Sequence, residues 1–279
     1  MAYENFIPAV WAEGIERELE RLHVFATDCN QEYEGEVTKQ GDSVHILGVG
    51  KPTIKTTASK KGVKLEGAED VEDTSVVMQI NQIAYFDFKI DDIDKRQAVG
   101  GVADALRSEA AEGIADVMDV YVASKAKDVT ASKYSKEAVL VTKDNILGEV
   151  DKALQKLYEN DVKTTTPVFI TLPPRAWTLF KQAYIAADTD NSKMLKNGKM
   201  AQYGGATIRM SNNCAKSQDG TTDYIMCRTK RAVAFVNPLT HVEPYRPENG
   251  FSDAVKGFSL YDAKIVRPKE LCILNWKYA

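Results

Sequence analysis

The sequence predicts an α+β protein of more than one unit, and three observations carry this prediction. Residues 76–90 place most of their large apolar side chains at even positions, the alternation of a strand with one buried face. Residues 98–127 repeat apolar positions every three or four residues, as an amphipathic helix does. From residue 134 onward, shorter helix and strand patterns follow one another and indicate a second, compact unit.

Composition limits the classes of protein to which the chain can belong. Its 279 residues carry 36 Lys and Arg against 40 Asp and Glu, a formal charge of −4, and 44% of them are hydrophobic. These values argue against a wholly disordered chain, and the sequence pI near 5.6 argues against a dedicated reader of DNA sequence. No window approaches about 18 consecutive apolar residues, and the first residues lack a signal-peptide pattern. We therefore expect a cytoplasmic protein without a membrane span.

The sequence offers no residues for an enzyme's chemistry. The histidines His23, His45 and His241 are isolated from one another, and no HExxH or GxSxG motif occurs. The run GVGKPT at 48–53 lacks the first glycine and the hydroxyl residue of a phosphate loop. We predict no catalytic, cofactor-binding or metal-binding residue.

The four cysteines form no CxxC pair and have no histidine beside them. This spacing indicates small buried hydrophobic residues rather than a zinc or redox site. They are Cys29, Cys214, Cys227 and Cys272.

The N-terminal segment predicts a short amphipathic helix. Residues 9–22 place Trp11, Ile15, Leu19 and Leu22 at helical spacing. A single helix of this length is marginal in water, so its apolar stripe needs a partner surface. That surface belongs either to the same domain or to a neighbouring subunit, and the sequence leaves both open.

Residues 31–75 predict an extended β-hairpin that cannot support itself. Short alternating pieces are punctuated by glycine, and no aromatic residue occurs between Tyr33 and Tyr85. Ordering a residue costs roughly 1 to 2 kcal/mol of backbone entropy, which so few apolar side chains cannot offset. We expect the hairpin to need a partner surface.

The hairpin also separates its charges into a basic half and an acidic half. Either the two halves pair within one chain, or they set the register of a contact with a neighbouring subunit. The basic half holds Lys51, Lys55, Lys60, Lys61 and Lys64, and the acidic half holds Glu66, Glu69, Asp70, Glu72 and Asp73.

The long helix expected at 98–127 should pack on the strand that bears Phe86 and Phe88. Acidic residues between the two elements, at 91, 92 and 94, suit the free amides of a helix start better than a cation site. The stripe predicted to face the strand is Val99, Val102, Leu106, Ala110, Gly113, Val117 and Tyr121.

The second unit should alternate helices and strands. A helix is expected at 145–158, with Ile146, Val150, Leu154 and Leu157 on one stripe. The other expected elements are a strand at 167–172, a helix at 175–186, a polar loop at 188–197, strands at 206–210, 223–227 and 232–236, and tail segments at 241–247, 257–268 and 271–276.

This order of parts resembles the major capsid proteins of tailed bacteriophages, which have the Hong Kong 97-type fold. The stretch PYRPENGFSDAVKGFSLYDAKIVRPKELCIL at 244–274 is similar to the end of many phage coat proteins. PVFITLPPRAWTLF at 167–180 and FDFKIDDIDKRQA at 86–98 support the resemblance, which covers essentially the whole chain.

The resemblance implies a division of the chain into named parts. Residues 1–30 would be the N-arm, 31–76 the E-loop, and 77–133 the first part of the peripheral (P) domain with its spine helix. Residues 134–237 would be the axial (A) domain, and 238–279 would return to the P domain, with LCILNW as a candidate extra strand of the A-domain sheet.

The resemblance also implies a function. The chain would be a viral structural subunit that forms the hexamers and pentamers of an icosahedral head, assembled in the host bacterial cytoplasm and resident in the virion. Expected partners are other copies of the chain, a separate scaffolding protein, a portal, and packaged double-stranded DNA contacted non-specifically, with no membrane. The predicted intersubunit contacts are Trp11, Lys51, Lys55, Lys60, Lys61, Lys64, Glu66, Glu69, Asp70, Glu72 and Asp73.

Two other functions stay open at this stage. An encapsulin-like nanocompartment shell would share the fold but hold protein cargo and no DNA. A small α/β hydrolase or transferase would be active as a monomer and would never form particles.

Overall fold

The computed structural model describes most of the chain, and all that follows concerns that part. It consists of residue 18 and residues 22–33, 43–49, 73–91, 102–129, 135–186, 200–247 and 252–278.

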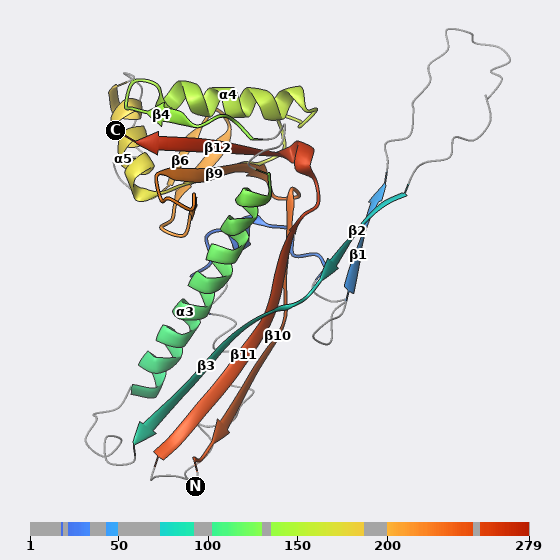
Figure 1. The fold of residues 1–279 in the computed structure, drawn as a ribbon, viewed down its shortest axis with the longest axis vertical. Helices are drawn as coiled ribbons and strands as arrows, with labels where there is room; N and C mark the ends of the chain where they lie inside the picture. Colours follow the sequence, from blue (N-terminus) through green and yellow to red (C-terminus); the bar gives the residue numbers. More distant parts are fainter. Residues whose placement is uncertain are drawn as a thin grey trace, which may run out of the picture.

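A long arm forms one half of the molecule (Figure 1). Its three-stranded antiparallel sheet has the order β10 (Val233–Tyr245), β11 (Ser252–Ile265), β3 (Gln82–Asp91). Helix α3 (Val102–Ser124) lies along this sheet and continues into a 3-10 turn, Lys125–Val129. We call the sheet and α3 together the arm.

The predicted strand at 76–90 is divided in two. Strand β2 (Asp73–Gln79) ends before Ile80 and Asn81, and β3 begins after them. The alternation nevertheless continues across the break, because Met78, Ile80 and Ala84 are buried while Tyr85 is 79% exposed.

The base of the predicted hairpin is confirmed as an antiparallel pair. Strand β1 (Ser43–Val49) pairs with β2 so that Ser43 lies opposite Gln79 and Val49 opposite Asp73. Val44, Ile46 and Met78 pack with arm residues in a small apolar cluster. Residues 50–72, which join the two strands, lie outside the described part.

The predicted inner stripe of the long helix is wrong in its central part, although its last residue, Tyr121, does pack against the core, and the side chains of Val99 and Val102 lie outside the described part. Val117 is 50% exposed, Gly113 is also exposed, and Leu106 is only half-buried. The face that packs on the sheet lies one residue further along and combines small with large apolar side chains: Ala111, Ile114, Ala115, Met118, Val122 and Ala126. Alanines allow the helix to approach the sheet closely, whereas the sequence pattern favoured the larger Val117.

The compact unit is a seven-stranded mixed sheet with two helices packed against it. The described order is β4 (Val139–Val141), β12 (Leu271–Tyr278), β9 (Thr222–Thr229), β5 (Val168–Leu172), β7 (Ala206–Met210), β6 (Met200–Tyr203), with β8 (Ala215–Lys216) on β9.

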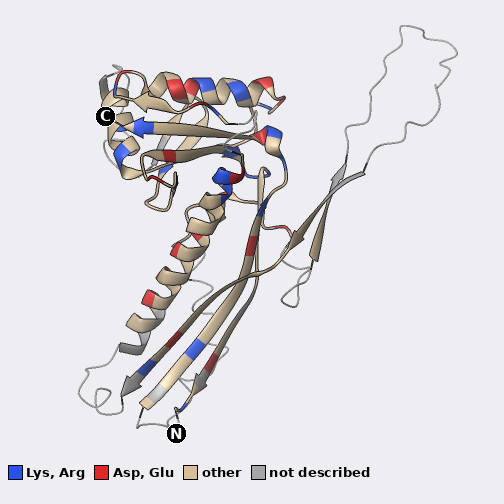
Figure 2. Ribbon diagram, viewed as in Figure 1, with Lys and Arg blue, Asp and Glu red and all other residues tan. Residues whose placement is uncertain are grey.

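Helices α4 (Ile146–Glu159) and α5 (Pro174–Ala186) share one core with this sheet. The stripe predicted for α4 is confirmed, because all four of its apolar residues are buried. Figure 2 shows basic and acidic residues interspersed along the outer face of α4, as expected for a solvated helix surface.

In the chain order, the two arm strands β10 and β11 lie between two strands of the compact sheet. Strand β9 of the compact sheet leads into β10 of the arm, and β11 leads back into β12. Strand β10 lies at the edge of the arm sheet, contains Pro238 and Pro244, and has an irregularity between Val236 and Leu239.

The corrected helix face can be tested with two adjacent residues. Met118→Ala should lower the free energy of unfolding by about 2 to 5 kcal/mol, because its fully buried side chain would leave a cavity. Val117→Ala should change that free energy by no more than about 0.5 kcal/mol. Urea unfolding of the unassembled subunit measures both, and equal losses would mean that the helix packs on a different face.

Candidate assembly surface

Ten of the eleven residues that the sequence predicts as intersubunit contacts lie outside the described part of the chain. These ten are Trp11 and the charged positions from Lys51 to Glu72. Asp73 is the first residue of β2, opposite Val49 on β1. Their role therefore stays a prediction. The described structure shows instead which residues hold the N-terminal segment and the hairpin base in place.

The N-terminal segment is held by a buried carboxylate on α3. Asp119 is 2% exposed and accepts hydrogen bonds from three consecutive backbone amides, those of Val24 (2.7 Å), Phe25 (3.1 Å) and Ala26 (3.1 Å). The His23 ring nitrogen Nδ1 lies 3.2 Å from the same carboxylate. Amides at the start of a helical turn have no acceptor within that turn. For the turn Ala26–Asp28 the acceptor is the Asp119 carboxylate of α3.

Two arginines of the compact sheet, one fully buried and one partly exposed, hold the same segment. Arg228 on β9 is fully buried, donates from Nη2 to the Phe25 carbonyl oxygen at 2.8 Å, and lies over the Phe25 ring. Arg209 on β7 forms an ion pair of 3.1 Å with Asp28. Burial raises the pKa of Asp28, and the nearby Arg209 charge opposes that rise.

The segment also pairs with the arm. The Asn30 amide donates to the Val233 carbonyl at 2.9 Å, and the Phe235 amide donates to the Asn30 carbonyl at 2.9 Å. We call residues 22–30 the clasp, since they contact α3, the compact sheet and β10 at once. The clasp therefore docks on its own chain, whereas Trp11, Ile15 and Leu19 lie outside the described part.

The hairpin is held by a second set of polar contacts. Asp262 on β11 accepts hydrogen bonds from the Asn81 amide (3.4 Å), the Ala263 amide (2.6 Å) and the Tyr121 hydroxyl (3.0 Å). Lys264 donates to the Val77 carbonyl of β2. Burial, and after it the Asp262 charge, raises the pKa of Tyr121.

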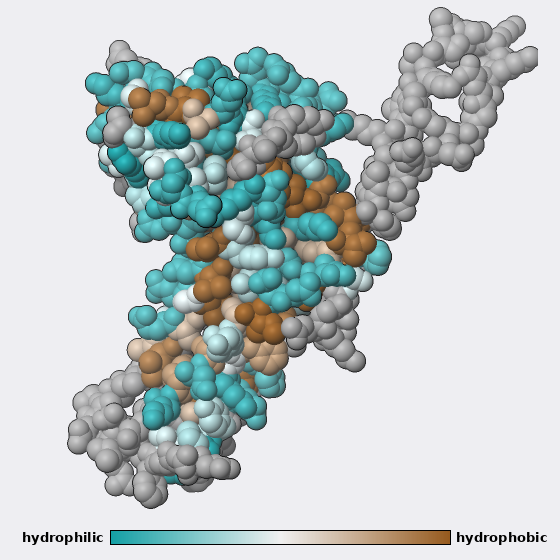
Figure 3. All heavy atoms as spheres, in the orientation of Figure 1, coloured by the Kyte–Doolittle hydropathy of each residue, from teal (hydrophilic) through white to brown (hydrophobic). Residues whose placement is uncertain are grey.

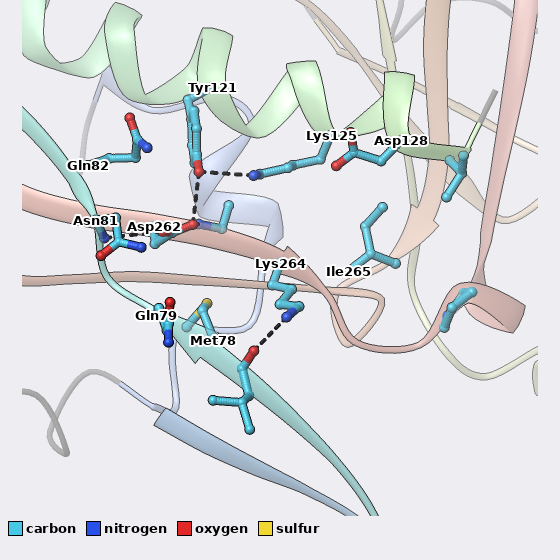
Figure 4. Close-up of a pocket in the computed structure, with 14 residues that line it drawn as sticks. Met78, Gln79, Asn81, Gln82, Tyr121, Lys125, Asp128, Asp262, Lys264 and Ile265 are labelled. Atoms are coloured by element: carbon cyan, nitrogen blue, oxygen red, sulfur yellow. Dashed lines mark hydrogen bonds between the residues drawn. The ribbon is translucent and has the colours of Figure 1, made fainter. Parts of the chain in front are cut away.

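A pocket of about 560 Å³ lies beside these contacts. Figure 4 shows it between the β2–β3 break, the end of α3 and β11, with Lys125 donating to the Tyr121 hydroxyl at 2.9 Å. We call Val77–Asn81 the hairpin root. The root lines one side of this pocket, and it is held by its polar contacts with Asp262 and Lys264 and by the small apolar cluster that buries Met78 and Ile80.

Five charged residues that hold the clasp and the hairpin root were missed by sequence reasoning: Asp28, Asp119, Arg209, Arg228 and Asp262. The only signal was a charged residue on an otherwise apolar face, as Asp119 is between Met118 and Val122. In the described residues, no group of three or more His, Cys, Asp or Glu could hold a metal ion. No helix there is both long enough and apolar enough to cross a membrane.

The role of Asp119 can be tested by hydrogen exchange. Asp119→Asn should lower the free energy of unfolding by about 1 to 3 kcal/mol, because an amide nitrogen would replace one acceptor oxygen facing the clasp. Exchange at Val24, Phe25 and Ala26 should become faster. Asp116→Asn, at an exposed position on the same helix, is the control, and unchanged exchange in the Asp119 variant would contradict this account of the clasp.

Asp262 should control the hairpin root in the same way. Asp262→Asn weakens the acceptor for Asn81, so amides of Asn81 and β2 should exchange faster while those of β9 and β12 keep their rates. Asp87→Asn on β3 is the matched control, since its exposed carboxylate contacts only Tyr245 among the hydrogen bonds described. If amide exchange at Asn81 and β2 became faster by the same factor in both variants, Asp262 would not hold the hairpin root specifically.

Comparison with known proteins agrees with this architecture. No family model and no curated protein sequence matches the chain. Among solved structures, a chain from Mycobacterium phage Che8 is 26% identical, with a TM-score of 0.72 and 90% of both chains covered.

Two further structures extend the likeness. The mature capsid of bacteriophage PhiM1 is 15% identical, with a TM-score of 0.63, covering 91% of this chain and 87% of that one. A virus-like particle from Pyrococcus furiosus is 11% identical, with a TM-score of 0.58, covering 95% and 98%. The chain therefore has the Hong Kong 97-type fold of tailed-phage major capsid proteins.

Proposed function

We propose that the chain is a major capsid protein, the self-assembling structural subunit of an icosahedral phage head. The observation that carries this is the likeness to the Mycobacterium phage Che8 chain, which extends over 90% of both chains at 26% identity. A match over 90% of both chains extends beyond either the arm or the compact unit alone, so it is not the likeness of one common domain.

The surface of the arm supports self-association. Tyr85 and Ile83 are exposed on one face of the arm sheet, and Val117 and Val120 are each 50% exposed on the outer face of α3. Figure 3 shows apolar patches on the arm surface. A thin arm with apolar residues on both faces gains stability when neighbouring copies cover it.

The parts of the chain receive their roles under this proposal. Residues 1–30 act as the N-arm, 31–76 as the E-loop, 77–133 with 238–279 as the P domain, and 134–237 as the A domain. Because β12 pairs with β9 and β4, we assign the last strand to the A-domain sheet.

The partners follow from the same proposal. Copies of the chain form hexamers and pentamers in the host cytoplasm, with a separate scaffolding protein and a portal, and the finished head holds double-stranded DNA without sequence-specific contacts. The lysines of the E-loop meet acidic residues of a neighbour, and Glu66 to Asp73 meet bases. The role is structural, and no residue is assigned to catalysis.

A cellular nanocompartment shell is the second candidate. The likeness to the virus-like particle from Pyrococcus furiosus favours it, but at 11% identity that likeness shows the fold alone. Nuclease treatment of purified particles separates the two functions. Protected double-stranded DNA supports a phage head, and a DNA-free shell around protein cargo supports a nanocompartment.

Electron microscopy tests the assembly itself. The expressed protein, alone or with a co-expressed scaffolding protein, should form closed shells tens of nanometres across, seen by negative staining and by sedimentation. Small oligomers of one size across all protein and salt concentrations would contradict the proposed function.

The charge-segregated hairpin provides a test of the intersubunit contact. Reversing Lys60 and Lys61 to Glu should leave the melting temperature of the unassembled subunit nearly unchanged, slow assembly, and weaken its dependence on ionic strength. Light scattering at several salt concentrations measures the rate. If the double variant instead destabilises the subunit and assembles normally, the two halves of the hairpin pair within one chain.

A further inference from the structure

Two cysteines lie opposite each other where the arm leaves the compact sheet. Strands β9 and β12 are antiparallel neighbours, and their register places Cys227 directly opposite Cys272. Both side chains are fully buried in the core that the sheet shares with α4 and α5. Both are free thiols.

This register satisfies the distance requirement for a disulfide. Residues directly opposite each other on antiparallel strands have Cα atoms about 4.5 to 5.5 Å apart. A disulfide joins residues whose Cα atoms are about 4.4 to 6.8 Å apart. Because opposite residues in a ladder also point to the same face, the two thiols face each other without a change of register.

The other two cysteines have different surroundings. The Cys29 thiol lies against the Phe25 carbonyl, and the Cys214 thiol lies against the Thr171 and Ser211 carbonyls. Neither stands opposite another cysteine in the strand registers described. They serve as internal controls in the same molecule.

We propose that Cys227 and Cys272 are a latent disulfide pair, which small-molecule disulfides oxidise to a covalent staple at the base of the arm. All of β10 and β11 lies between the two cysteines in the sequence. The disulfide would therefore close a covalent loop that contains all of β10 and β11, and it would fix the point where the arm joins the compact unit.

The chemistry balances with a small disulfide as the oxidant. One protein thiolate attacks a sulfur of the small disulfide, forms a mixed disulfide and releases one small thiol. The second protein thiolate then attacks the protein sulfur of that mixed disulfide and releases the second small thiol. Each protein thiol loses its proton, and the two electrons given up by the protein sulfurs reduce the small disulfide.

The native fold makes this reaction slow but not impossible. Burial raises the pKa of both thiols, which lowers the fraction of reactive thiolate, and the positive charge of Lys136 opposes this rise at each of them. The oxidant must also reach side chains that have no solvent exposure. Oxidation therefore proceeds through local opening of β12 and accelerates as the temperature approaches the melting point.

The proposed function gives the pair a biological setting, although the chemistry of the pair does not depend on it. A subunit made in a reducing cytoplasm keeps both thiols, and a particle released into an oxidising medium can form the bond. Closing the loop removes conformational freedom from the unfolded chain, so the oxidised protein should be harder to unfold.

The experiment uses the purified, unassembled full-length chain, so its outcome does not depend on shell formation. The protein is incubated with oxidised glutathione a few degrees below its melting temperature, quenched in acid, denatured, and treated with a thiol-blocking reagent. Peptide mapping without reduction should show one cross-linked peptide pair, Cys227 with Cys272, while Cys29 and Cys214 are blocked. Before blocking, the intact mass should fall by two hydrogen atoms, and the melting temperature should rise and return on reduction.

Variants identify the pair independently. Cys272→Ala should abolish the cross-link, whereas Cys214→Ala should leave it unchanged. Four blocked thiols in the oxidised wild-type protein, or cross-links to Cys29 or Cys214 in similar yield, would overturn the proposal. If a variant fails to fold, the wild-type peptide map alone distinguishes these outcomes.

Discussion

The arrangement of the whole molecule depends on a buried negative charge, the carboxylate of Asp119. A charge removed from water must be matched by donors, and here they are three successive backbone amides and a histidine ring of the clasp. The hydrogen bonds to that carboxylate hold the clasp against α3. The clasp in turn provides the Phe25 carbonyl for the buried Arg228 and the buried Asp28 carboxylate for Arg209, so these contacts join segments that are remote in sequence.

This network makes the joint between arm and compact unit firm, in contrast with the hairpin root. Two strand connections and the clasp cross the joint, and several of their contacts are buried and charged. The root is held by one small apolar cluster and by polar contacts beside a pocket. The joint is therefore held by buried charged contacts, whereas the hairpin base is held mainly by the apolar residues Val44, Ile46, Met78 and Ile80.

The parts that the sequence predicted correctly are those with a strong local pattern. The stripe of α4 and the alternation from Met78 to Phe88 follow from apolar spacing alone, because each element turns one face to apolar clusters, α4 to one cluster and the alternation to two. The α3 stripe was misplaced because its true inner face includes Asp119 and several alanines. The hydrogen-bond donors to Asp119 lie 93 to 96 residues away in the sequence, and a local sequence pattern cannot predict a contact at that separation. The break at Ile80 and Asn81 was missed because the alternation continues through it.

The two prolines of β10 limit how copies of the chain can associate under the proposed function. A proline inside a sheet has no amide hydrogen to donate, and it is confined to positions where that hydrogen would point away from the partner strand. The outer rim of the arm sheet thus lacks donors at Pro238 and Pro244, and a foreign strand added there would find gaps in its ladder. Open-ended polymerisation by strand addition along the β10 edge is therefore disfavoured.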